Sequence, residues 1–317
     1  MSALVTFGET MLRLTPPDDD RVERADSFEV HVGGAESNVA VAAQRLGVES
    51  AWLSKLPETP PAARVIGALR EQGVDTHVAR SETGRVGTYY LETGADPRGT
   101  NVVYDREAAA VRTATTGELA VEAIEDADVF YTSGITPALS ETLVETVAAL
   151  FSLANAADTH VAFDVNYRAK LWTPEEAQDV LRGLLPAVDT LVVAERDAEV
   201  VLDRHGAAAD VAADLAAEYD CETVIVTQGA DGATAVHDGE TYDQPVFEAA
   251  SPYPVGTGDA FVGAFLAERQ RGGSVADALA YAAAAAALKR TIPGDMALFS
   301  HEEVTEVIAG ASGGISR

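Results

Sequence analysis

Residues 161–168 read Val161-Ala162-Phe163-Asp164-Val165-Asn166-Tyr167-Arg168, a short apolar run followed by polar side chains. A short apolar run between helical patterns predicts a strand that is buried on both faces of a sheet. Similar runs occupy residues 129–131, 191–193 and 224–226. Enough residues for one or two helices separate consecutive runs. This rhythm is typical of a doubly wound α/β fold with a mostly parallel sheet.

The polar residues after these runs are the first candidates for a functional site. Ligands of doubly wound sheets bind at the carboxyl ends of the strands. The segments at those ends are Gly134-Ile135, Asp164 to Arg168, and Gln228 to Gly232. We therefore expect their side chains and backbone groups to share one edge of the sheet.

Two segments break the alternation of apolar runs and helical patterns. Residues of about 12–32 and 85–111 are more polar and alternating, which predicts short antiparallel strands outside the main sheet. A small β layer added to an α/β domain suggests a lid that excludes water from a transferase site. The alternative is a surface hairpin without such a role. We treat residues 1–317 as one domain that carries this lid.

The composition bounds the class of protein. The chain has 317 residues, of which 47% are hydrophobic, enough to bury a substantial core. It contains no apolar run of about 18 residues and no basic signal segment at its start, so we expect a cytoplasmic protein that spans no membrane. One cysteine, Cys221, excludes an internal disulfide. The six histidines lack metal-ligand spacing, so a zinc site is not expected.

The charge is strongly negative and evenly spread. Asp and Glu number 51 against 22 Lys and Arg, giving a net charge of −29. Such a field repels nucleic acid and anionic membranes, so neither is expected as a partner. Concentrated salt damps the mutual repulsion of these charges. The composition is therefore typical of a protein from a halophilic, archaeal cytosol.

Residues 254–261, Pro254-Val255-Gly256-Thr257-Gly258-Asp259-Ala260-Phe261, place two glycines and an acid where a loop opens into an apolar helix. Free backbone N–H groups at a helix start can bind an anion. An aspartate beside them can take the proton of a hydroxyl that attacks a phosphoryl group, as a small-molecule kinase requires. The alternative is that the glycines only make a turn and Asp259 only caps the helix.

Two common nucleotide motifs are missing from the sequence, but a third pattern is present. There is no G-x-x-x-x-G-K-[ST] loop and no G-x-G-x-x-G after the first strand. Three motifs in order resemble the ribokinase-like (PfkB) carbohydrate kinases: Gly33-Gly34-Ala35-Glu36-Ser37-Asn38-Val39-Ala40, Asp164-x-Asn166-x-Arg168, and Gly256-x-Gly258-Asp259. The resemblance covers nearly the whole chain and implies the ribokinase-like fold and ATP as phosphoryl donor.

Within that family, residues 89–92 and 103–106 are similar to kinases of 2-keto-3-deoxygluconate. The substrate of those kinases is a sugar acid, and arginine offers a planar pair of donors for a carboxylate. The resemblance assigns this contact to Arg106 and Arg168. The alternative for Arg106 is a surface ion pair with Asp105 or another neighbour.

The resemblance implies further substrate contacts. Gly34 would let the sugar lie against the backbone, and Asn38 would bind its hydroxyls. Ile135 would make a backbone contact, and Asp295 would close the site from the C-terminal side, unless it is only a turn residue.

Tyrosines of the lid would cover the substrate. Adjacent strand residues point to opposite faces, so Tyr89 and Tyr90 cannot both face inward. We predict that Tyr90 and Tyr104 face the substrate and that Tyr89 packs elsewhere.

The resemblance also assigns the nucleotide and the chemistry. The catalytic amides would come from Gly256, Thr257 and Gly258, and Asp259 would be the general base on the C6 hydroxyl, giving 2-keto-3-deoxy-6-phosphogluconate. Mg²⁺ would neutralise the donor phosphates. The residues implied to bind ATP are Asn166, Arg168, Thr227, Gly229, Asp231, Gly232, Gly256 and Gly258.

Two departures from the family pattern leave the metal ligands unassigned. The usual D-T-x-G-A-G-D is Tyr253-Pro254-Val255-Gly256-Thr257-Gly258-Asp259 here, and Ala194 and Asp197 stand at the N-x-x-E positions. Two other functions stay open: a kinase of a neutral sugar such as fructose or ribose, and a sugar or nucleotide sensor without activity. We also expect a homo-oligomer, because exposed lid edges are often covered by another subunit.

Overall fold

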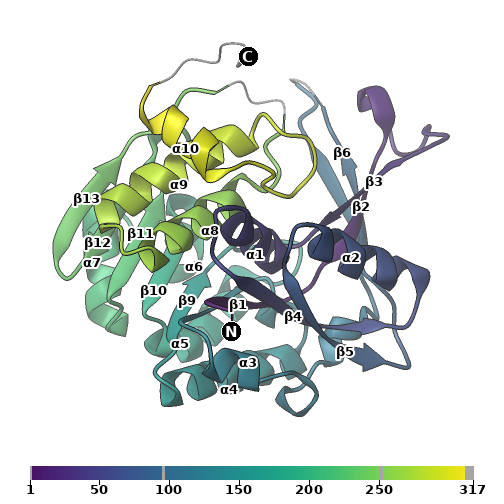
Figure 1. Cartoon of the computed structure of the whole chain (residues 1–317), viewed down its shortest axis with the longest axis horizontal. Helices are drawn as coiled ribbons and strands as arrows, with labels where there is room; N and C mark the ends of the chain where they lie inside the picture. The colour runs from purple at the N-terminus through teal and green to yellow at the C-terminus, as the bar shows by residue number, and fades with distance from the viewer. Residues whose placement is uncertain (1, 95–96, 250–252, 311–317) are drawn as a thin grey trace.

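The structure is a computed structural model that describes residues 2–94, 97–249 and 253–310. Its strands form two sheets (Figure 1). The larger sheet contains β1 (Leu4–Phe7), β4 (Ser50–Pro57), β5 (Asp75–Ser81), β8 (Val129–Ser133), β9 (His160–Asp164), β10 (Thr190–Ala194), β11 (Thr223–Thr227), β12 (Ala233–His237) and β13 (Glu240–Gln244). The smaller sheet contains β2 (Met11–Thr15), β3 (Glu29–Gly33), β6 (Thr88–Glu92) and β7 (Asn101–Asp105). The helices are α1 (Ala35–Arg45), α2 (Pro60–Glu71), α3 (Glu122–Glu125), α4 (Glu141–Ala156), α5 (Pro174–Leu184), α6 (Glu195–Leu202), α7 (Ala208–Tyr219), α8 (Thr257–Gln270), α9 (Val275–Lys289) and α10 (His301–Ile308).

The larger sheet confirms the predicted fold class. Its strand order is β13-β12-β11-β10-β9-β8-β1-β4-β5, and all neighbours are parallel except for the two pairs made by β12. The four predicted strands are β8, β9, β10 and β11, which lie side by side. Parallel neighbours require long crossover connections, which the helices supply.

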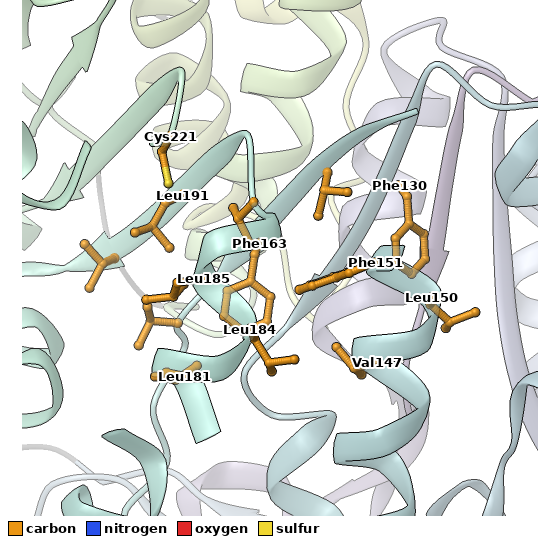
Figure 2. Packing of buried hydrophobic residues seen from close by; sticks show 14 of the residues in the cluster. Phe130, Val147, Leu150, Phe151, Phe163, Leu181, Leu184, Leu185, Leu191 and Cys221 are labelled. Carbon is orange, nitrogen blue, oxygen red and sulfur yellow. The ribbon is translucent and has the colours of Figure 1, made fainter. Parts of the chain in front are cut away.

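Alternating side chains of these strands bury both faces of the sheet. Phe130 and Phe163 point to one face, where Phe151 of α4 packs edge-on against both rings at centroid separations of 6.1 and 5.8 Å (Figure 2). Tyr131 and Ala162 point to the other face and pack with α8 and α9. The apolar runs are continuous because helices cover both faces.

The smaller sheet stands beside α1 and α2, at the right of the view in Figure 1. Its order is β3-β2-β6-β7. The prediction of extra strands within 12–32 and 85–111 is confirmed, although residues 95 and 96 lie outside the described residues. The expectation that all these strands are antiparallel is wrong, because β2 and β6 pair in parallel. Strand β6 joins the sheet after a long crossover from β2, and not through a hairpin.

Among the described residues, no helix is both long enough and apolar enough to cross a membrane.

Candidate active site

A cavity of about 360 Å³ lies where the smaller sheet faces the carboxyl ends of the central strands. Twelve of the predicted site residues line it: Gly34, Asn38, Tyr104, Arg106, Ile135, Asn166, Arg168, Gly256, Thr257, Gly258, Asp259 and Asp295. Residues 33–40, 164–168 and 254–259 are far apart in the chain, and the fold brings all three motifs to this one cavity. The carboxyl-end rule for doubly wound sheets therefore located the cavity correctly.

The glycine loop before α8 presents free backbone donors. Gly256 has φ of 80° and forms the N-cap of α8. The first bond of the helix runs from the N–H of Ala260 to the carbonyl of Gly256, at 2.9 Å. The prediction of a free amide at Thr257 is wrong, because its N–H donates to the carbonyl of Pro254 at 3.3 Å. The N–H groups of Gly258 and Asp259 have no acceptor among the residues that the structure describes. A β-carbon at Gly258 would meet no atom within 4 Å, so an anion can approach these amides closely.

Asp259 lies at this helix start but does not cap it. Its Oδ2 accepts a hydrogen bond of 2.7 Å from Nδ2 of Asn38 in α1. Burial raises the pKa of Asp259 to about 6, while the bond from Asn38 and the charge of Arg168 oppose the rise. A carboxyl group with this pKa is ionised at neutral pH and still basic enough to accept a proton.

The loop after β9 places an arginine opposite Asp259. Asn166 adopts φ of 39°, and its N–H donates to Oδ1 of Asp164 at 3.0 Å. Nη1 of Arg168 donates to the carbonyl of Tyr167 at 3.1 Å, and Arg168 forms no ion pair within the described residues. Its charge lowers the pKa of Asp164, although burial dominates and raises that pKa to about 7. Arg168 is thus a cation without a carboxylate partner at the cavity wall.

Arg106 forms an ion pair with Glu9, a residue outside the three motifs that carry the family resemblance. Its Nη2 forms a buried ion pair with Oε2 of Glu9, and its guanidinium lies 5.1 Å from the centre of the Tyr104 ring. The alternative of a surface pair with Asp105 is wrong, because Asp105 pairs with Arg85 at 2.7 Å. Nε of Arg106 is buried and has no hydrogen-bond partner in the described structure.

Tyr89, and not Tyr90, faces the cavity, so that part of the lid prediction is wrong. Tyr89 lies opposite Tyr104 in the β6–β7 pairing, with ring centres 5.9 Å apart. Residues opposite each other in a sheet share a face. Tyr90 therefore points to the other face, where its ring packs edge-on against Phe28.

Asp295 joins the lid to the body of the protein. Its Oδ1 accepts a hydrogen bond of 2.6 Å from the hydroxyl of Tyr89, and its Oδ2 lies 3.2 Å from Nε of Arg13. Both partners belong to the smaller sheet. The alternative of a mere turn residue does not account for these two buried contacts.

Gly34 is needed for packing within the protein. A β-carbon there would lie 2.0 Å from the carbonyl oxygen of Glu9. The predicted reason, close approach of a sugar, is therefore not the only one: Gly34 lines the cavity, but its missing side chain makes room for Glu9.

Glu36, in the first turn of α1, is buried at the base of the cavity. Its Oε1 accepts three hydrogen bonds, from the N–H and hydroxyl of Ser133 at 3.2 and 2.7 Å and from the hydroxyl of Thr136 at 2.8 Å. Burial nevertheless raises its pKa to about 7.

Ile135 was predicted to contact the substrate through its backbone. Its N–H donates to the hydroxyl oxygen of Ser133 at 3.3 Å, so its carbonyl is the backbone group that remains for such a contact.

We expect Glu36→Gln to stabilise the protein at alkaline pH. The pKa of Glu36 is about 7 in the folded protein, above the ordinary value of 4.5 that holds in the unfolded chain. Between these two pKa values the native state binds more protons than the unfolded chain. The contribution of Glu36 to stability is therefore lost as pH rises through about 7. Glutamine keeps an acceptor for the three bonds and removes this loss, a gain of up to about 3 kcal/mol at pH 8 that shrinks toward pH 5. Denaturant unfolding at both pH values measures it, with exposed Glu125→Gln as control. Equal destabilisation at both pH values would contradict the expectation.

The predicted nucleotide residues divide into two groups. Asn166, Arg168, Gly256 and Gly258 line the cavity. Thr227, Gly229, Asp231 and Gly232 do not. Thr227 ends β11 and the other three follow it, two strands away from the Asp164 end of β9 and at the same edge of the sheet. Their assignment to ATP stays a prediction.

The described residues include no group of three or more His, Cys, Asp or Glu side chains placed to hold a metal ion. Asp197, at the altered N-x-x-E position, is buried, and its Oδ2 accepts from the N–H of Tyr167 at 3.2 Å. Its Oδ1 pairs with Arg196 at 2.9 Å. Asp197 therefore supports the loop of Arg168, and a metal centre built from protein ligands alone does not fit here.

The motifs did not predict three residues that line the cavity, Glu9, Tyr89 and Glu36, or the contact of Arg13 with Asp295. Glu36 stands inside a quoted motif, but the sequence does not show that its side chain is buried. Glu9 and Arg13 follow the first strand and gave no signal of their own, because their partners Arg106 and Asp295 are distant in the sequence.

Comparison with known proteins identifies the family of the chain. The pfkB family carbohydrate kinase model matches residues 1–301. A 2-dehydro-3-deoxygalactonokinase from Haloferax volcanii is 55% identical over 314 residues, covering 99% of each chain. A 2-dehydro-3-deoxygluconokinase from Thermoproteus tenax is 28% identical over 97% of this chain and 94% of the relative.

Solved structures give the same answer. The crystal structure of 2-dehydro-3-deoxygluconokinase from Thermotoga maritima superposes with a TM-score of 0.92 at 37% identity, covering 97% of this chain and 98% of that one. The predicted fold class and family are confirmed. The chain therefore belongs to the PfkB family of carbohydrate kinases and is an ATP-dependent sugar kinase.

Proposed function

We propose that this kinase transfers the γ-phosphoryl group of ATP to the C6 hydroxyl of 2-keto-3-deoxygluconate, giving 2-keto-3-deoxy-6-phosphogluconate. The observation that carries the proposal is the buried Nε–H of Arg106, a donor in the cavity wall without a protein acceptor. An unpaired buried donor costs about 1–3 kcal/mol, which a substrate carboxylate would recover. Arg168, free of any ion pair in the described structure, offers a second cation. A neutral sugar would need neither.

The chemistry follows from the residues around the cavity. Asp259 takes the proton of the C6 hydroxyl, whose oxygen attacks the γ-phosphorus as the bond to the ADP oxygen breaks. The amides of Gly258 and Asp259 face the transferred group and stabilise its charge. Asn38 holds the carboxylate of Asp259 in position through its 2.7 Å bond. Mg²⁺ bound to ATP would neutralise part of the phosphate charge.

The C4 epimer, 2-keto-3-deoxygalactonate, is a second candidate substrate. It is supported by the 55% identity to a protein named 2-dehydro-3-deoxygalactonokinase. Both acids carry the carboxylate that Arg106 and Arg168 would bind. The same relative comes from Haloferax volcanii, which supports our proposal of a cytoplasm rich in salt as the working environment, in line with the net charge of −29.

Turnover of four acceptors tests the substrate class. We expect ADP release in concentrated KCl with Mg²⁺ and ATP for both sugar acids, and little for fructose or ribose. Arg106→Lys keeps a positive charge beside Glu9 but has no counterpart of the buried Nε–H donor, so kcat/KM for the sugar acids should fall on the order of tenfold. Arg85→Lys, at the exposed pair with Asp105, is the matched control.

Preferred turnover of a neutral sugar would overturn the sugar-acid proposal and leave the kinase chemistry in place. ATP binding without transfer to any of the four acceptors would favour a sensor. Highest activity in dilute buffer would contradict the proposed salt-rich environment.

A further inference from the structure

Lys289, the last residue of α9, is fully buried although lysine is among the residues least often found in protein interiors. Its Nζ donates to the backbone carbonyls of Ile292 and Gly294, at 3.0 and 3.1 Å. These carbonyls belong to the turn that leads from α9 to Asp295. The ammonium group therefore ties the end of the helix to the residue that contacts the lid.

The same side chain passes directly behind the glycine loop. A β-carbon at Gly256 would lie 3.3 Å from Cε of Lys289 and 2.1 Å from the carbonyl oxygen of Asp295. Gly256 thus packs onto both the lysine stem and the Asp295 backbone. The position of the amides at Gly258 and Asp259 depends on this contact, because Gly256 is the residue from which α8 starts.

The cavity wall carries more carboxyl groups than arginines, so a buried cation next to it offsets negative charge. The wall holds two arginines and the carboxyl groups of Glu9, Glu36, Asp164, Asp259 and Asp295. ATP would add several negative charges in front of Asp259. Three charged groups from different segments shift the pKa of Lys289: Asp295 and Asp259 raise it, and Arg13 lowers it. Burial lowers the pKa of Lys289 to about 8, and the two acids partly offset this effect, so the ammonium stays charged at neutral pH.

We propose that Lys289 is a positioning residue for phosphoryl transfer: its buried ammonium fixes the glycine loop at Gly256 and offsets the negative charge around Asp259 from behind. The inference rests on the transfer step proposed above. A lysine suits this place because its compact charge can donate to more than one carbonyl at once. It touches no reacting atom and acts through the loop.

Three variants test the proposal. Lys289→Met keeps most of the side-chain volume and removes the charge. We expect kcat to fall at least about tenfold, with the KM for the sugar acceptor within about threefold of wild type. Lys55→Met is the control, because Lys55 is also buried, donates to the carbonyl of Thr113 at 3.0 Å, pairs with Glu118 at 2.7 Å and does not line the cavity. It should lose stability and keep kcat.

Lys289→Ala separates charge from packing. Methylammonium chloride can enter the space left by the side chain and donate to the two carbonyls, so we expect it to restore part of kcat. Tetramethylammonium chloride at the same concentration gives equal ionic strength but cannot donate a hydrogen bond, and it should restore nothing. An equal response to both salts, or to neither, would assign the loss to packing and overturn the proposal.

Calorimetric binding of MgATP without an acceptor gives a readout that does not depend on the sugar. The Kd should rise roughly tenfold in Lys289→Met and stay unchanged in Lys55→Met. Unchanged MgATP binding together with unchanged kcat would overturn the role of Lys289. Failure of the wild type to phosphorylate any sugar acid would overturn the proposed substrate alone, since the binding comparison still decides the role of Lys289.

Discussion

Asp259→Asn should lower kcat by about 10²- to 10⁴-fold while MgATP still binds, because the variant removes the general base and leaves the glycine loop in place. The asparagine has nearly the same shape and can still accept the bond from Nδ2 of Asn38. Single-turnover transfer to the sugar acid, together with calorimetric binding of MgATP, measures both parts of the expectation.

The pH dependence of kcat/KM in the wild type is a second test of Asp259 as the general base. The pKa of Asp259 is raised to about 6, so kcat/KM should rise as pH increases through that value and the carboxyl group loses its proton. The residual activity of Asp259→Asn should lack this rise.

Asp277→Asn is the control for a simple capping role. Asp277 is the third residue of α9, and its Oδ2 accepts a bond of 3.3 Å from the backbone N–H of the N-cap residue Ser274, so it completes the capping box of its helix. Its loss should cost about 1 kcal/mol of stability and no activity. If Asp259→Asn behaved in the same way, the assignment of the base would be wrong.

The sequence predicted the sheet and the cavity for a physical reason. Strands such as Val161-Ala162-Phe163 are covered by helices on both faces, so they leave an uninterrupted apolar run that can be recognised without any partner. Polar residues that follow such runs must then gather at one sheet edge. Asp164, Asn166 and Arg168 were found in this way.

The remaining features depend on contacts between distant segments. The choice between Tyr89 and Tyr90 required the β6–β7 register, since a shift by one residue exchanges the two faces of a strand. The pair Arg106–Glu9 joins residues almost a hundred positions apart, and neither side chain predicts the other.

Lys289 illustrates the same limit. The sequence shows only an alanine-rich helix that ends in a lysine, and high helix propensity explains the alanines. Its contact with Gly256 exists only because α8 and α9 pack together in the structure.

Gly256→Ala should be the most damaging change to the glycine loop. Gly256 has φ of 80°, a conformation that costs a residue with a β-carbon about 1–2 kcal/mol. The new β-carbon would also lie 2.1 Å from the carbonyl oxygen of Asp295, so the loop or the Asp295 segment must move. A displacement of about 1 Å at a reacting centre can cost about 10² in rate, and we expect at least that loss in kcat.

Gly272→Ala separates the two causes. Gly272, just after the other end of α8, has φ of 84°, but a β-carbon there would meet nothing within 4 Å. It should therefore carry the same backbone strain without the clash, lower the melting temperature by less than Gly256→Ala does, and keep kcat. A comparable loss of kcat in both variants would mean that helix stability alone governs the rate. If only Gly256→Ala loses activity, the result ties phosphoryl transfer to the position of the loop against Asp295, where the lid, the end of α9 and the start of α8 meet.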